Sequence, residues 1–211
     1  MRVDIWSDVI CPWCYLGKAR FANALGSFAH RDEVEVVYRS FELDPGYPKD
    51  RQETNSAMLG RKYGLSEADA HAAESRIAGL AAAEGLGFAP ERPVGNTFDL
   101  HRVLQLGLAK GAQADLVRAL DQAYFAQARP VFDRDVITEL AAGAGLDAAL
   151  TTEVIDGDGY AEEVRQDEGL ARQLGITGVP FFVLDMALGV SGAQSTEVLA
   201  SALQQAWDRR G

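Results

Sequence analysis

Asp8-Val9-Ile10-Cys11-Pro12-Trp13-Cys14-Tyr15 is the stretch that decides the fold, and it contains both cysteines of the 211-residue chain. It lies where the alternating apolar pattern of residues 2–7, which is typical of a strand, changes to the apolar spacing of a helix. Proline suits the first turn of a helix because its missing N–H would have no partner there. The sequence therefore predicts a helix that begins at Pro12, with Cys11 as its cap and Cys14 about one turn inside.

This position gives the two thiols different chemistry. A thiolate at a helix N-terminus faces unpaired N–H groups and the positive end of the helix dipole, which can lower its pKa to roughly 3.5 to 7.5. Cys11 is therefore the candidate nucleophile. The two-residue spacer places Cys14 close enough to attack a mixed disulfide on Cys11, which makes Cys14 the candidate resolving thiol.

Two other interpretations of the cysteine pair are structural thiols and half of a zinc site. Zinc usually takes four ligands from spaced Cys or His pairs, whereas the histidines of this chain, His30, His71 and His101, occur singly. A C-x-x-C at a strand-to-helix turn is typical of a redox motif. We therefore expect a redox-active dithiol and no metal.

The composition limits the partners that we expect. Twenty basic residues against 31 acidic ones give a formal net charge of -11, which disfavours a nucleic-acid partner. No apolar run approaches the ~20 residues that span a bilayer, and residues 2–7 resemble a strand rather than part of a secretion signal. We expect a cytoplasmic protein without a membrane partner, and the sequence leaves its oligomeric state unknown.

Strands and helices alternate at both ends of the chain. Residues 34–39 alternate like residues 2–7, and the helix between them makes a right-handed βαβ unit with parallel strands. Near the C-terminus, residues 181–190 predict a β-hairpin, and Ser195 or Thr196 caps a final helix. The pattern predicts an α/β fold made of βαβ and ββα halves.

The residues between these halves, 46–169, are rich in Ala, Leu and Gly and contain no confident strand. Apolar positions recur there at helical spacing, and capping residues and glycines delimit several helices. We therefore expect two domains, residues 1–45 with 170–211 and an all-helical insertion over 46–169. The predicted helices begin at or near Ser66, Asn96, Ala112, Asp133, Ala148 and Tyr160.

Four groups of residues carry a resemblance to a known family: Asp8–Tyr15, Arg39–Pro45, Asn96-Thr97 with His101-Arg102, and Gly175–Phe182 with Ser191–Gln194. Together they resemble the DsbA-like thioredoxin-fold thiol:disulfide oxidoreductases, and within them the FrnE-type branch related to 2-hydroxychromene-2-carboxylate isomerases. The resemblance spans nearly the whole chain. It implies a thioredoxin fold with an all-helical insertion, disulfide exchange at Cys11 and Cys14, and a cis peptide bond before Pro180.

A substrate cleft is expected over Cys11, because binding sites favour domain junctions and the insertion must meet the other domain near one edge. Trp13, Asn96 and His101 are its candidate lining residues. A hydrogen-bonded helix position suits His101 better than a role as a base, and an exposed packing position suits Trp13 equally well. Val179 is expected to offer its backbone to an extended substrate. The expected substrate is a disulfide-containing protein or small molecule.

The isomerases and the kappa-class glutathione transferases share the fold and the Val-Pro loop but typically have a serine where this chain has Cys11. A serine can orient a glutathione thiol, whereas Cys11 with Cys14 can itself form a disulfide, so we rank a dithiol oxidoreductase or disulfide isomerase first. The alternative is a glutathione-dependent isomerase or transferase acting on an aromatic or polyketide-like small molecule. A third interpretation is a redox-inactive binding module that acts through the insertion.

Under the alternative function, the segment before the last helix would bind glutathione. The N–H groups of Gly192, Ala193 and Gln194 would then hold a glutathione carboxylate at the helix N-terminus. Glutathione is in that case a co-substrate. No resident cofactor is predicted under either function, beyond the redox-active disulfide itself.

Asp4 and Asp8 are the candidate proton acceptors for Cys14, because related thioredoxin folds keep an acid beneath the helix. Asp4 matches the position of that acid only with a one-residue offset. A charged side chain on a strand covered on both faces is costly unless it has a purpose, which favours Asp4. The alternative is that Asp4 lies near the end of the sheet in water.

Overall fold

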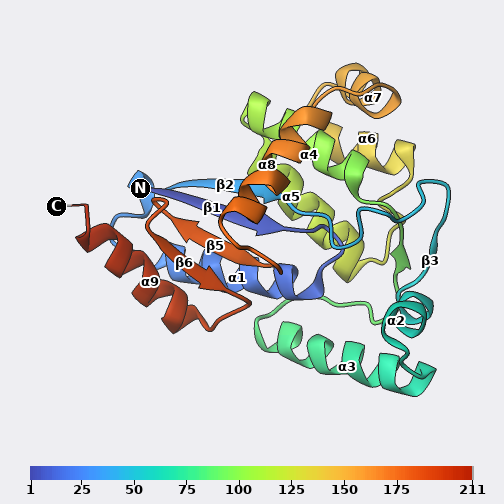
Figure 1. Cartoon of the computed structure of the whole chain (residues 1–211), viewed down its shortest axis with the longest axis horizontal. Helices are drawn as coiled ribbons and strands as arrows, with labels where there is room; N and C mark the ends of the chain where they lie inside the picture. The colour runs from blue at the N-terminus through green and yellow to red at the C-terminus, as the bar shows by residue number, and fades with distance from the viewer. Residues whose placement is uncertain (211) are drawn as a thin grey trace. The chain divides into compact units, whose positions relative to one another are not determined.

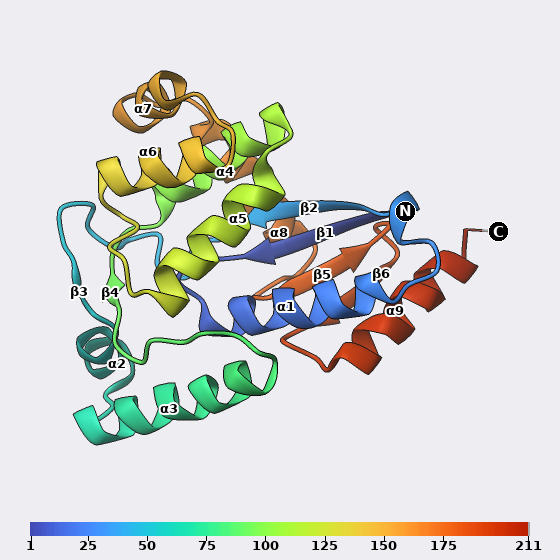
Figure 2. The same ribbon diagram turned by 180° about the vertical axis from the view of Figure 1, so that it is seen from behind.

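The computed structural model describes residues 1–210, and its internal contacts divide the chain into two compact units. The first unit combines Met1–Leu43 with Glu162–Gly211, and the second is Asp44–Ala161. Figures 1 and 2 show the helices and strands of each unit from opposite sides. Within residues 1–210, no helix is long and apolar enough to cross a bilayer.

A four-stranded sheet forms the centre of the first unit, in the order β2-β1-β5-β6 (Figure 1). A parallel pair of strands requires a crossover connection, which α1 (Pro12–Gly26) supplies between β1 and β2. β5 is antiparallel to both of its neighbours, β1 and β6, so the predicted βαβ and ββα halves are confirmed. The strands are β1 (Arg2–Ser7), β2 (Glu35–Ser40), β5 (Phe181–Leu184) and β6 (Leu188–Ser191).

Two helices, α1 and α9 (Thr196–Asp208), cover one face of this sheet (Figure 2). Val3 and Ile5 of β1 point to that face, because successive side chains of a strand point to opposite sides. Trp6 points to the other face, where it joins a second apolar cluster with residues of α8 (Ala161–Gln173). The partners of Val3 and Ile5 on the first face include Phe21, Ala24, Phe28, Phe182, Leu184, Leu199 and Leu203.

α8 is also fixed to the sheet by buried charges, which we call the Asp4–Arg39–Asp167 cluster. Asp167 of α8 accepts hydrogen bonds from Arg39 Nη1 at 2.7 Å and from the Ser40 N–H at 2.9 Å. The carbonyl oxygen of Asp167 accepts another from Trp6 Nε1 at 3.0 Å. Arg39 Nε donates to Asp4 Oδ1 at 2.7 Å. These contacts hold α8 in the first unit, whereas the sequence assigns residues up to 169 to the insertion.

The second unit consists of helices and one short pair of strands. The Ser66 side chain caps its helix as predicted, since it accepts a hydrogen bond from the Asp69 N–H. The predicted all-helical insertion also contains a small antiparallel sheet, in which Glu53 pairs with Val94. In chain order the elements are β3 (Glu53–Thr54), α2 (Asn55–Tyr63), α3 (Glu67–Ala83), β4 (Pro93–Val94), α4 (Phe98–Lys110), α5 (Gln113–Asp121), a π-helical turn (Gln122–Ala126), α6 (Arg134–Gly143) and α7 (Ala148–Asp156).

Arg102 of α4 fixes the end of α7 inside the second unit. The last carbonyl groups of a helix have no partner within the helix, so they need donors from elsewhere. The buried guanidinium supplies these donors and also pairs with Asp99 of its own helix. Its backbone acceptors are Val154, Ile155 at 3.1 Å, Gly157 at 3.0 Å and Gly159 at 3.2 Å.

Candidate active site

Cys11 caps helix α1, so its sulfur lies at the helix N-terminus. The Cys11 backbone is extended (φ -79°, ψ 111°), and its Sγ accepts a hydrogen bond from the Cys14 N–H at 3.3 Å. Both thiols are free and buried, and no group of three or more potential metal ligands is found within residues 1–210. A negative charge on Cys11 Sγ would therefore meet a backbone donor and the positive end of the helix dipole.

Cys14 lies one turn inside α1 and is fully buried. Burial raises the pKa of the Cys14 thiol well above its ordinary value, and the hydrogen bond and charge of Cys11 raise it further. The Asp8 N–H and the positive charge of Lys18 lower this pKa, because both favour the thiolate. The net rise keeps Cys14 protonated at neutral pH.

At neutral pH, iodoacetamide should label Cys11 and leave Cys14 unlabelled. Alkylation requires a thiolate, and the raised pKa of Cys14 keeps that thiol protonated, whereas a thiolate on Cys11 would be stabilised at the N-terminus of α1. Peptide mapping of the reduced, labelled protein by mass spectrometry locates the label. Protein unfolded in denaturant is the control, in which both thiols should react, and preferential labelling of Cys14 in the folded protein would contradict the prediction.

The loop before β5 brings Val179 and Pro180 to Cys11. The Cys11 thiol donates a weak hydrogen bond to the carbonyl oxygen of Val179, with the sulfur 3.7 Å from the oxygen. The Val179–Pro180 peptide bond is cis, which is the isomer that the family resemblance implies. Two of the predicted site residues therefore lie beside the Cys11 sulfur.

Helix α1 approaches this loop at Gly17, where the structure needs a residue without a side chain. A Cβ atom at this position would lie 2.8 Å from Cγ of Pro180 and 3.4 Å from Cα of Ala193. The first distance is shorter than real Cβ atoms show, and the atom belongs to the Pro180 ring, which cannot turn aside as the end of a flexible side chain does. Gly17 therefore allows α1, Pro180 and Ala193 to pack directly against one another.

The segment Gly192–Gln194 is anchored to the same loop and helix. The Gly192 N–H donates to the carbonyl oxygen of Pro180 at 2.9 Å, and Arg20 of α1 donates to that of Ala193 at 2.9 Å. Gly192 has a φ of +81°, in the region that favours glycine. The Gln194 side-chain amide donates to the backbone of β6 at 2.8 Å. The structure thus brings these three predicted residues next to Pro180 and α1.

The N-terminus of α9, which follows this segment, already carries a carboxylate. Hydrogen bonds to Glu197 from Ser195 and from its own backbone N–H lower the Glu197 pKa, and the charge of Arg20 adds to this. The Ser195 hydroxyl in turn accepts a hydrogen bond from the Val198 N–H at 3.4 Å. A glutathione carboxylate at this helix end, as expected under the alternative function, would compete with Glu197.

The structure does not bring Asp4 to Cys14. Asp4 alternates along β1 with the residues that face α1, so its side chain lies on the opposite face of the sheet, in the Asp4–Arg39–Asp167 cluster. There its carboxylate pairs with Arg39 at 2.7 Å and with Arg2 at 3.1 Å. These two arginines explain why a charged side chain is buried here. Asp4 therefore has a structural role, and the prediction that favoured it as the proton acceptor for Cys14 is wrong.

Asp8 lies next to both cysteines through its backbone. Its N–H faces the Cys14 sulfur, and its carbonyl oxygen accepts a hydrogen bond from the Cys11 N–H at 3.2 Å. Its buried carboxylate accepts a hydrogen bond from the Leu43 N–H at 2.7 Å. Of the two candidate acids, Asp8 is therefore the one beside the dithiol.

Lys18 is a residue near Cys14 that the sequence analysis does not single out. It follows Cys14 by four residues on α1, and helical side chains at this spacing lie on the same face. Lys18 is 9% exposed. A lysine in a helix is usually solvated, so the sequence offers no sign of this burial apart from the spacing to Cys14.

The three predicted lining residues belong to different units. Trp13 is half-buried in the first turn of α1, in the unit that holds the dithiol, whereas Asn96 and the buried His101 belong to the second unit. Asn96 Oδ1 accepts a hydrogen bond from the Phe98 N–H at 2.9 Å, and its Nδ2 donates to the carbonyl oxygen of Tyr47 at 2.7 Å. Helix α4 begins one residue later than predicted, because Asn96 bonds two residues ahead instead of occupying the cap itself.

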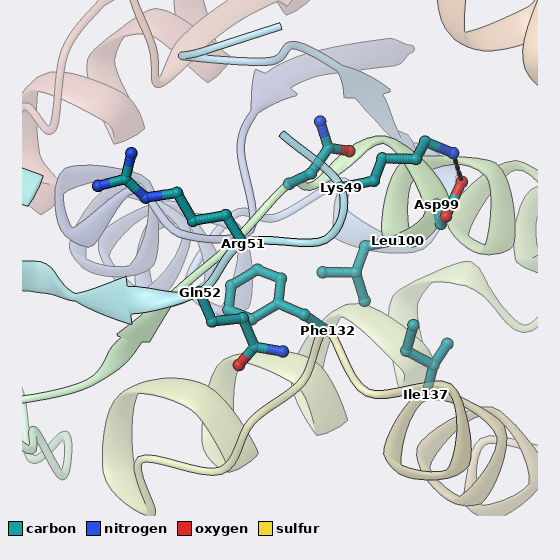
Figure 3. A pocket seen from close by; sticks show the side chains of 8 residues that line it. Lys49, Arg51, Gln52, Asp99, Leu100, Phe132 and Ile137 are labelled. Carbon is teal, nitrogen blue, oxygen red and sulfur yellow. Dashed lines mark hydrogen bonds and ion pairs between the residues drawn. The ribbon is translucent and has the colours of Figure 1, made fainter. Parts of the chain in front are cut away.

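A small pocket adjoins Asn96 in the second unit (Figure 3). Leu100, Phe132 and Ile137 supply apolar walls, and Lys49, which also lines it, is paired with Asp99 at 2.8 Å. The cavity volume of about 50 Å³ is well below the roughly 300 Å³ at which ligand pockets begin. The pocket has room for water and not for a molecule of the size of glutathione.

The four-stranded sheet, the Cys-Pro-Trp-Cys motif at the start of α1 and the Val-Pro loop beside it define a thioredoxin-fold protein with a dithiol at a helix N-terminus. The family model for the DSBA-like thioredoxin domain matches residues 2–204. Because this match covers nearly the whole chain, the chain belongs to that family. The resemblance to the DsbA-like thioredoxin family that was stated from the sequence is confirmed.

The chain is also similar to solved structures. A probable DsbA oxidoreductase from Streptomyces coelicolor is 54% identical, with a TM-score of 0.96 over 100% of this chain and 92% of that one. A 2-hydroxychromene-2-carboxylate isomerase is 15% identical, with a TM-score of 0.72 over 100% and 98%. The cytosolic disulfide reductase DsbM from Pseudomonas aeruginosa, in a structure with GSH, is 18% identical, with a TM-score of 0.67 over 99% and 100%. The last two similarities show a shared fold.

Proposed function

We propose that the chain is a cytoplasmic thiol:disulfide oxidoreductase or disulfide isomerase that acts through Cys11 and Cys14. The observation that carries the proposal is the pairing of Cys11, at the N-cap of α1, with a fully buried and protonated Cys14 one turn further on. This arrangement makes one sulfur the nucleophile and holds the other back for the second step. Two observations support the setting and the chemistry: the 54% identity to a probable DsbA oxidoreductase, and the shared fold of a cytosolic disulfide reductase.

The reaction consists of two thiol–disulfide exchanges. In the reducing direction, the Cys11 thiolate attacks one sulfur of a substrate disulfide, so that a Cys11–substrate bond forms and the other substrate sulfur leaves and takes a proton. Cys14 then loses its proton and attacks Cys11 Sγ, which forms the Cys11–Cys14 disulfide and releases the second substrate thiolate. Two electrons pass from the dithiol to the substrate, and the reverse sequence oxidises a substrate dithiol.

The groups around Cys11 suit a substrate that binds in an extended conformation. The Val179 carbonyl oxygen, 3.7 Å from Cys11 Sγ, is an acceptor for a substrate backbone N–H beside the reacting sulfur. Trp13, half-buried two residues after Cys11, adds an aromatic surface within the motif itself. Backbone pairing is independent of substrate side chains, so we infer a range of disulfide-containing substrates.

Glutathione is the thiol that we propose to return the oxidised protein to its dithiol state. The DsbM structure, which has the same fold, contains GSH. One glutathione thiolate attacks the Cys11–Cys14 disulfide to form a mixed disulfide, and a second attacks that bond to release glutathione disulfide. The two glutathione molecules supply the two electrons that each turnover transfers to a substrate.

Cys11→Ser should reduce insulin reduction and the refolding of a scrambled disulfide protein to background, because a hydroxyl cannot form the mixed disulfide. The wild-type protein, with glutathione as the reductant, should be active in both assays. Far-UV circular dichroism checks that the variant is folded. Full activity of Cys11→Ser with glutathione would overturn the proposal and indicate a glutathione-dependent isomerase or transferase, whose relatives typically have serine at this position.

A further inference from the structure

We propose that Lys18, a buried residue of α1, is a positioning residue for the second exchange: its positive charge stabilises the Cys14 thiolate as that thiolate attacks the mixed disulfide on Cys11. The inference rests on the proposed dithiol chemistry. It goes beyond that chemistry because it names a group that sets how readily Cys14 ionises in the mixed disulfide.

The geometry of α1 directs Lys18 toward Cys14. Long side chains in a helix point back toward its N-terminus, over the residues three and four positions earlier, and Cys14 is four positions before Lys18. Both residues are on the buried face of α1. An opposite charge within about 4 to 6 Å favours the ionised form of a group, and it does so more strongly where water is excluded. The position and burial of Lys18 thus suit it to act on the Cys14 sulfur.

The titratable and charged groups that act on Cys14 come from the helix cap, the preceding loop and α1 itself. Cys11 raises the pKa of Cys14 through a hydrogen bond and through its charge, whereas the Asp8 N–H and the Lys18 charge lower it. In the mixed disulfide Cys11 carries no charge, so its charge no longer raises the pKa of Cys14. The Asp8 N–H and Lys18 remain, and Cys14 becomes easier to ionise after Cys11 has reacted.

The second exchange balances without a proton from Lys18. Cys14 gives its proton to water, its thiolate attacks Cys11 Sγ, and the Cys11–Cys14 bond forms while the bond between Cys11 and the leaving thiol breaks. The leaving thiol departs as a thiolate with the bonding electron pair. Lys18 stays protonated throughout, so it acts through Cys14 and does not itself react.

A coloured leaving thiol provides the test. Ellman's reagent reacts with Cys11 to leave a thionitrobenzoate mixed disulfide, and attack by Cys14 then releases a second thionitrobenzoate, which stopped-flow absorbance records over a range of pH. The variant is Lys18→Met, which removes the charge at similar length. Lys18→Arg is the matched control because it keeps the charge. A Cys14→Ser background isolates the first reaction.

In Lys18→Met, the apparent pKa of the second release should rise by about one unit. Below that pKa the release should be about threefold to fourfold slower, because the thiolate fraction falls about tenfold while the nucleophilicity of the remaining thiolate rises about threefold. Above both pKa values the variant should be about threefold faster than wild type. Lys18→Arg should follow wild type, and the first release should be unchanged by Lys18→Met in the Cys14→Ser background.

Superimposed pH profiles of Lys18→Met and wild type would overturn the assignment. A second release that is slower in Lys18→Met by the same factor at every pH would also overturn it, because a uniform loss of rate indicates a structural defect. If Lys18→Met does not fold, Lys18→Gln is compared with Lys18→Arg, each in a Cys11→Ser background. The ultraviolet absorbance of the Cys14 thiolate over pH then gives the pKa of Cys14 in each variant. Ellman's reagent is not a biological substrate, so inactivity on protein substrates would refute the proposed function and leave the Lys18 result standing. Failure of Cys11 to form any mixed disulfide would refute both.

Discussion

Cys14→Ser should accumulate a covalent adduct between Cys11 and its substrate, with turnover lost. Cys11 still attacks a substrate disulfide in this variant, but a hydroxyl cannot make the second exchange that releases the substrate. The reaction therefore stops at the mixed disulfide. With insulin or a scrambled disulfide protein as the substrate, a non-reducing gel should show a stoichiometric adduct that disappears on reduction.

The matched control for this experiment is the double variant Cys11→Ser with Cys14→Ser, which should form no adduct. In a glutathione-dependent isomerase or transferase the reacting sulfur belongs to glutathione, and the protein only positions it. Cys14 would then be dispensable. Normal activity of Cys14→Ser that requires glutathione would therefore contradict the dithiol mechanism and favour that alternative.

Asp167→Ala should lower the free energy of unfolding by about 3 kcal/mol, a large part of the roughly 5 to 15 kcal/mol of a typical domain. The change removes the acceptor of the Ser40 N–H and one of the two carboxylates paired with Arg39. Although burial lowers the Arg39 pKa, the carboxylates of Asp167 and Asp4 raise it above its ordinary value. The variant leaves this charged guanidinium with Asp4 as its remaining carboxylate, and water has little access to the freed Ser40 N–H because Ser40 is 2% exposed.

Urea denaturation followed by far-UV circular dichroism measures the effect. Asp32→Ala is the control, because the Asp32 side chain is 94% exposed and lies 3.7 Å from its partner Arg31. An exposed pair of this kind contributes little, so this variant should unfold at the wild-type urea concentration. Equal midpoints for Asp167→Ala and wild type would show that the Asp4–Arg39–Asp167 cluster does not stabilise the fold.

Local sequence patterns explain why most of the fold was predictable. The strand of residues 2–7 and the helix after Pro12 are long enough to show their periods, and Ser195 caps the last helix as expected. β3 and β4 have two residues each, which is too short for an alternating pattern. Helix α2 was not predicted because Asn55 is its buried residue, so it shows no apolar stripe.

The features of the site that the sequence did not predict depend on contacts between residues that are distant in the chain. Cys11 and Cys14 followed from their spacing, and Val179 and the Gly192–Gln194 segment from the resemblance. Nothing near Asp4 in the sequence reveals that Arg39, on the next strand, and Asp167, on α8, share one charge cluster with it. Burial of Asp167 likewise depends on how α8 packs, and for the same reason the contacts divide the chain near residue 161 where the sequence places the boundary at 169.

β1 is a central strand, yet its two neighbours come from opposite ends of the chain. Val3 pairs with Val36, which is made soon after it, and with Leu184, which is made near the end of synthesis. A ribosome adds roughly 5 to 20 residues per second, so β1 waits about 10 to 35 seconds for β5. During that interval the Val179 loop that lies beside Cys11 does not yet exist. Each new molecule therefore contains both thiols of the Cys-Pro-Trp-Cys motif before it contains the loop that packs beside Cys11 in the folded protein.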